Sequence, residues 1–108
     1  MNQDMLDELV QGILRSLREA PVRIVLYGST ARGTNTDESD VDIAVFVHSR
    51  LRAEEDDLLS DIIVDMNLKY DKVFSVIDID EAIYQKWRLV TPFYQNVDRE
   101  GVILWTAA

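Results

Sequence analysis

Two short segments carry the residue types that could do chemistry in this chain. The first is Gly28-Ser29-Thr30-Ala31-Arg32-Gly33, and the second, after five intervening residues, is Ser39-Asp40-Val41-Asp42. A glycine turn after a strand directs backbone N–H groups at one spot and, with a serine hydroxyl, suits a phosphate group. Carboxylates are preferred ligands of Mg²⁺. Together the two segments indicate metal-dependent phosphoryl or nucleotidyl transfer.

The two aspartates can act together because of their spacing. Residues two apart on a strand share one face and lie about 7 Å apart at Cα, so the carboxylates of Asp40 and Asp42 can bridge hard cations. Without Mg²⁺ or a similar ion they would repel a triphosphate. The common nucleotide loops do not fit: Thr34 and Asn35 stand where a P-loop needs Lys and Ser/Thr, and the closely spaced glycines of the dinucleotide fingerprint are absent.

The elements that position these residues follow from hydrophobic periodicity. Helical spacing predicts helices over residues 2–18, 53–70, 81–89 and 92–98, and apolar or alternating runs predict strands over 22–27, 40–47, 73–79 and 102–105. One small mixed sheet flanked by helices, a two-layer α+β or α/β arrangement, is expected. The 108 residues suit a single domain over 1–108. The acids at 54–57 are interpreted as the solvated start of a helix.

Composition excludes several functional classes. The 47% hydrophobic content supports a packed core and excludes intrinsic disorder. A formal net charge of -9 disfavours general nucleic-acid binding. The absence of cysteine removes disulfides, thiol nucleophiles and cysteine zinc sites and fits a reducing compartment. Residues 1–7 carry acids instead of the basic region and apolar core of a signal peptide. No apolar run approaches the roughly 18 residues of a membrane helix, so a cytoplasmic protein is expected.

The glycine-serine turn followed by an acid-x-acid strand resembles the DNA polymerase β-like nucleotidyltransferase superfamily. Within it, the Gly-Ser-x-Ala-Arg-Gly form and the spacing to the acids are similar to the minimal nucleotidyltransferases, or MNT proteins, over about residues 22–79 and again over 92–102. The resemblance implies a polymerase β-like core that uses Mg²⁺ to transfer AMP from ATP to a protein hydroxyl. It also implies a HEPN-domain toxin as partner in a hetero-oligomer, with the MNT protein as antitoxin. The alternative is a nucleotide-binding subunit with weak or lost catalysis that neutralises the HEPN partner by binding it.

The resemblance also assigns roles to single residues. Gly28 and Ser29 would bind the nucleotide phosphates, and Asp40 and Asp42 would hold the metal ions. For Arg32, contact with the nucleotide and a structural ion pair both stay open.

The superfamily's third carboxylate is missing from its usual place. It belongs on the strand after the long helix, where Ser75 now stands, and a serine replaces a carboxylate neither as base nor as strong ligand. Asp71, Asp78 and Asp80 lie near the ends of that strand. Asp78 is expected to take the catalytic role through a shifted register; if Ser75 instead faces the acid pair, the site lacks its natural base.

Four aromatic residues lie outside these motifs, near the end of the chain. For them, core packing and a partner-binding patch both stay open: Trp87, Phe93, Tyr94 and Trp105.

Overall fold

The computed structural model describes residues 2–28, 31, 33 and 40–107 as one mixed four-stranded sheet flanked by helices. The elements run α1 (Gln3–Ser16), β1 (Arg23–Tyr27), β2 (Val41–Val47), α3 (Ala53–Tyr70), β3 (Phe74–Asp80), α4 (Glu81–Trp87), α5 (Pro92–Glu100) and β4 (Val102–Thr106). The strand order is β3-β2-β1-β4. β1 is antiparallel to β2 and β4, whereas β2 and β3 are parallel. The expected mixed α+β sheet is confirmed.

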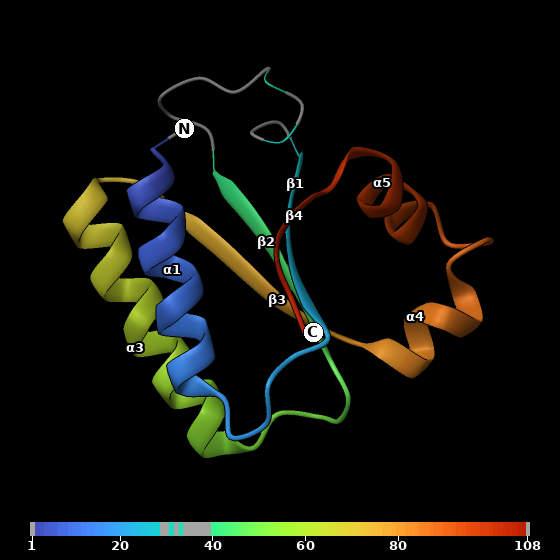
Figure 1. Cartoon of the computed structure of the whole chain (residues 1–108), viewed down its shortest axis with the longest axis horizontal. Helices are drawn as coiled ribbons and strands as arrows, with labels where there is room; N and C mark the ends of the chain where they lie inside the picture. The colour runs from blue at the N-terminus through green and yellow to red at the C-terminus, as the bar shows by residue number, and fades with distance from the viewer. Residues whose placement is uncertain (1, 29–30, 32, 34–39, 108) are drawn as a thin grey trace.

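Helices cover both faces of this sheet, which adds a third layer to the two that the sequence indicated (Figure 1). The reason lies in β2, where every residue is buried except the half-buried Asp42. A strand that is apolar on both sides must be covered on both sides. Figure 1 shows α1 and α3 on one side of the sheet and α4 and α5 on the other.

The larger part of the core lies under α1 and α3. Buried residues from both helices pack on one face of the strands, among them Leu9 and Ile13 of α1 and Ile43 of β2. The two helices approach closely at Gly12, where a Cβ atom would lie 2.7 Å from Ile62 Cγ2. The opposite face packs a smaller cluster around Phe46 and Tyr84, whose ring centroids are 4.8 Å apart.

The start of α3 differs from the expectation of a solvated acidic turn. Glu55 is buried, and its two carboxylate oxygens accept the backbone N–H groups of Arg18 at 3.0 Å and Arg52 at 2.9 Å. These hydrogen bonds tie the end of α1 to the start of α3 and lower the pKa of Glu55. The interpretation of this residue as part of a solvated turn is therefore wrong, while Glu54, Asp56 and Asp57 are exposed as expected.

The helices are too short or too polar for a bilayer. Within the described ranges, none is long and apolar enough to cross a membrane.

Candidate functional site

The site begins where β1 ends beside the start of β2. The antiparallel register pairs Tyr27 with Asp42, so the turn that follows β1 starts directly beside the acidic segment. Gly28 has φ +78°, a left-handed conformation that side chains other than glycine rarely adopt. A Cβ atom at Gly28 would lie 2.6 Å from Oδ2 of Asp42. Only glycine therefore lets the backbone at residue 28 lie against the Asp42 carboxylate.

The two aspartates influence each other electrostatically. Partial burial raises the pKa of Asp42, and the negative charge of Asp40 raises it further. Asp40 is exposed at the residue before β2 and has further interactions of its own. The charged form of Asp42 is thus disfavoured in the protein alone, as expected where a cation completes the charge balance.

Tyr27 extends the site and was not singled out from the sequence, whereas Phe93 was considered there for core packing or a partner-binding patch. The half-buried Tyr27 ring meets Phe93 of α5 edge-on, with centroids 5.6 Å apart. Burial, and next the charge of Asp42, raise the pKa of the Tyr27 hydroxyl. The available signal was the position of Tyr27 as the last strand residue before the glycine turn.

The position of the third carboxylate is decided by the parallel register of β2 and β3. Asp42 pairs with Ser75, whereas Asp78 pairs with Val45. Because strand side chains alternate between faces, Asp78, three residues beyond Ser75, lies on the opposite face of the sheet from Asp42. The expected convergence of Asp78 with the acid pair is therefore wrong: the register is unshifted, and Ser75 stands beside Asp42.

The remaining predicted nucleotide ligands, Ser29 and Arg32, lie outside the described residues. Of the predicted site residues, the structure brings Gly28, Asp40 and Asp42 together.

The Asp40 and Asp42 carboxylates suit Mg²⁺ better than they suit a metal ion whose ligands all come from the protein. In the described part of the chain, no group of three or more His, Cys, Asp or Glu side chains could hold a metal. Mg²⁺ is usually bound by one or two carboxylates, with substrate phosphates and waters completing the shell. Asp40 and Asp42 would supply the carboxylates, and substrate phosphates with waters would complete the shell.

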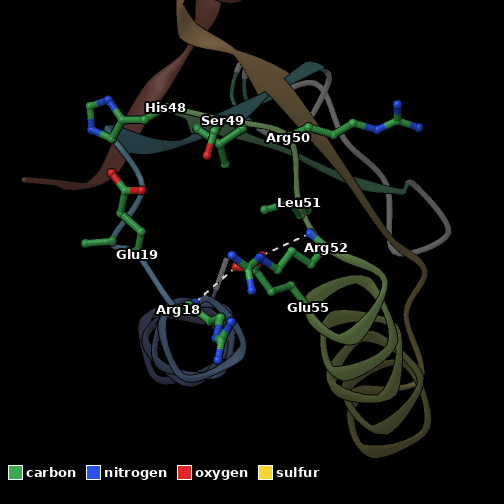
Figure 2. Close-up of a pocket in the computed structure, with 10 residues that line it drawn as sticks. Arg18, Glu19, His48, Ser49, Arg50, Leu51, Arg52 and Glu55 are labelled. Atoms are coloured by element: carbon green, nitrogen blue, oxygen red, sulfur yellow. Dashed lines mark hydrogen bonds between the residues drawn. The ribbon is translucent and has the colours of Figure 1, made fainter.

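A small cavity of about 130 Å³ lies at the other end of β2, beyond Val47 (Figure 2). Figure 2 shows the Glu55 carboxylate reaching the backbone N–H groups of Arg18 and Arg52 there. Arg50 points away from these residues in the same view. The cavity surrounds the hydrogen bonds from the backbone N–H groups of Arg18 and Arg52 to Glu55. The length of β2 separates it from Asp42.

Comparisons with known proteins agree with this geometry. The model of the nucleotidyltransferase domain family matches residues 8–97. Two proteins of Methanocaldococcus jannaschii, provisionally named protein adenylyltransferases, are 31% and 32% identical to this chain over 106 and 99 residues. These matches cover 97% and 92% of this chain and 100% and 94% of the relatives.

Solved structures share the fold. A toxin–antitoxin structure with AMP-PNP has a TM-score of 0.64 and 23% identity, covering 99% of this chain and 75% of that one. A mutant of the toxin–antitoxin MntA–HpeT has a TM-score of 0.65 and 21% identity, with the same coverage. The family match over residues 8–97, the two relatives that align along nearly the whole chain and the glycine turn set against an acid pair lead to one conclusion: this chain belongs to the nucleotidyltransferase domain family.

Proposed function

We propose that the protein is a Mg²⁺-dependent nucleotidyltransferase that moves a nucleoside monophosphate, AMP from ATP, onto a protein hydroxyl. The observation that carries the proposal is the contact between the left-handed Gly28 turn and the Asp42 carboxylate, with Asp40 two residues away. This contact supports the proposal because it sets the turn proposed to bind phosphate beside the proposed metal ligands. The names of the two Methanocaldococcus relatives support adenylyl transfer to protein.

Each residue of the site has a distinct task in this reaction. The Gly28 turn binds the triphosphate through backbone N–H groups, with Ser29 adding its hydroxyl. Asp40 and Asp42 hold Mg²⁺, which when bound neutralises the phosphates and favours attack at the α-phosphorus. The acceptor oxygen bonds to that phosphorus, pyrophosphate leaves, and the hydroxyl proton passes to a base. Ser75 cannot serve as that base, so water or a group of the acceptor protein receives the proton.

The proposed biological setting is antitoxin action in the cytoplasm on a HEPN-type toxin. Support comes from the fold shared with toxin–antitoxin structures, one of which holds AMP-PNP. The -9 net charge favours a protein acceptor over a nucleic-acid one, because an acidic surface repels a phosphate backbone.

A second candidate function rests on Ser75. Because a serine stands beside Asp42 where a carboxylate would serve as base, this second proposal has slow catalysis. The protein would then act as a nucleotide-binding subunit that neutralises its partner by holding it.

The deciding experiment uses the purified protein, [α-³²P]ATP, Mg²⁺ and the protein encoded by the neighbouring gene. Label transferred to that protein, and lost in Asp42→Asn, is the outcome expected of the enzyme. Stable complex formation and neutralisation without label would establish the second function instead. Lys86→Gln, a change on exposed α4 away from the acid pair, provides the control.

A further inference from the structure

A larger cavity of about 480 Å³ lies beside β3, on the side of the sheet that α4 and α5 cover. Ile77 and Ile79 of β3 line it, together with Ile83 of α4 and the neighbouring aromatic residues Phe93 and Tyr94 of α5. This volume falls in the range of small-molecule pockets, which are mostly apolar with a few polar groups. Phe93 and Ile83 stay 39% and 51% exposed, so their apolar surfaces are open to a ligand.

The cavity lies next to the candidate transfer site on the same face of the sheet. Ser75 pairs with Asp42, and Ile77, two residues further along β3, has its side chain on the same face. Two strand residues span about 7 Å. On the α5 side, Phe93 contacts Tyr27, which is itself the strand partner of Asp42. The end of the cavity at Ile77 and Phe93 is therefore about one sugar ring away from the metal ligands, and its other end reaches Val47 and Arg50.

We propose that this cavity binds the base of the nucleotide substrate, an assignment that rests on the proposed function. The strand order fixes the direction of the ligand: Gly28 follows β1 on one side of Asp42, and β3 lies on the other. With the triphosphate in the Gly28 turn and the α-phosphate at Asp42, the ribose extends over Ser75 and the base reaches Ile77 and Phe93. Aromatic and aliphatic walls suit the apolar faces of a base.

The test compares ATP with inorganic tripolyphosphate, each with Mg²⁺, by calorimetry on the wild-type protein and two variants. Phe93→Ala should weaken ATP binding roughly 5- to 150-fold, the usual effect of removing one stacking partner of a base. Tripolyphosphate, which has no base, should bind the variant as it binds the wild type. The matched control is Leu89→Ala, at a position that is 78% exposed and does not line the cavity, and it should change neither affinity.

A second measurement does not depend on how well a variant folds. In the wild-type protein with Mg²⁺ and ATP, NMR should show nuclear Overhauser effects from adenine H2 or H8 to the δ1 methyl groups of Ile77 and Ile83. Their absence in the saturated complex overturns the proposal.

The outcomes separate the base pocket from the transfer site. If Phe93→Ala leaves ATP affinity unchanged and slows only label transfer, the cavity receives the acceptor side chain and the base assignment is wrong. If the wild type binds ATP no better than tripolyphosphate, the phosphate and metal site stands while the base pocket fails. If the wild type binds neither ligand, the proposed function fails and the base pocket fails with it.

Discussion

The consequence of Ser75 for catalysis can be tested by restoring the missing acid. Ser75 and Asp42 are paired neighbours on parallel strands, about 4.8 Å apart across the sheet. Ser75→Asp therefore places a third carboxylate beside the acid pair, where it can hold metal and accept the proton of the acceptor hydroxyl. Asp78→Ala is the matched control, because Asp78 is exposed and lies on the same strand but the opposite face.

The geometry sets the size of the expected effects. A positioned base contributes about 10²- to 10⁴-fold, or roughly 3 to 5 kcal/mol of barrier. Two carboxylates about 5 Å apart repel by about 3 kcal/mol at an effective dielectric constant near 20, and solvent reduces this at a half-buried position. For 108 residues the unfolding entropy is about 0.2 kcal/mol per kelvin, so the variant should melt up to about 10 °C lower without metal. Mg²⁺ should restore much of that loss.

The assay measures initial rates of label transfer from [α-³²P]ATP to the partner protein at saturating Mg²⁺, alongside thermal melts with and without Mg²⁺. Faster transfer in Ser75→Asp, with unchanged transfer in Asp78→Ala, is the expected pair of results. The reasoning would be refuted by a Ser75→Asp variant that folds and binds Mg²⁺ and ATP as the wild type does, yet transfers no faster. Loss of transfer in Asp78→Ala would show that the register assigned to β3 is not the functional one.

Three further predictions concern Asp42, Gly28 and the buried Glu55. Asp42→Asn should abolish the Mg²⁺-dependent part of ATP binding in calorimetry, and should raise the melting temperature without metal, because burial and a like charge disfavour the ionised carboxylate. Gly28→Ala should cost about 1 to 2 kcal/mol in denaturant unfolding for its left-handed φ and, by displacing the Asp42 carboxylate, should weaken Mg²⁺–ATP binding. Glu55→Gln should lose about 1 to 3 kcal/mol, since an amide cannot accept the Arg18 and Arg52 N–H groups with both of its atoms. Because the pKa of Glu55 is lowered in the folded state, its carboxylate stabilises the fold at pH values above the ordinary carboxylate pKa. This stabilisation is lost as the pH falls through the lowered pKa. Melting temperatures of the wild type and Glu55→Gln at several pH values would measure the loss.

The acid pair could be predicted from the sequence because its evidence is local. The alternation of Asp40, Val41 and Asp42 predicts both carboxylates on one face. In the structure β2 begins at Val41, and the charge of Asp40 still raises the pKa of Asp42. The glycine turn is local in the same sense. Gly28 has a positive φ, which a residue without a side chain adopts readily.

The register of β3 could not be predicted in this way. Its segment offers acids at 71, 78 and 80, at different phases of the strand alternation, and a shift of one residue exchanges the two faces. Packing decides the matter, since Phe74 is buried in the cluster under α3 and Ile79 in the cluster under α4. That arrangement leaves Ser75 on the face of Asp42.

The burial of Glu55 escaped prediction for a related reason. Its donor Arg18 lies 37 residues earlier in the chain, so no local pattern distinguishes this acid from its solvated neighbours. Contacts between distant segments form only when the helices pack. From the sequence alone, acids in the first turn of a helix are interpreted as compensating the helix dipole.

The electrostatics of the site imply that metal and nucleotide bind with mutual dependence. Asp42 is partly buried and lies near the charge of Asp40, so without a cation its ionised form is disfavoured. The same negative charges repel any further anion. A triphosphate alone adds negative charge and should bind poorly, while Mg²⁺ alone finds only two carboxylates of the six ligands it prefers. Each ligand supplies what the other lacks. Because linkage is reciprocal, the factor by which Mg²⁺ raises ATP affinity must equal the factor by which ATP raises Mg²⁺ affinity. Calorimetric titrations in both orders should give the same factor, and ATP affinity that is indifferent to Mg²⁺ would show that Asp40 and Asp42 do not form a metal site.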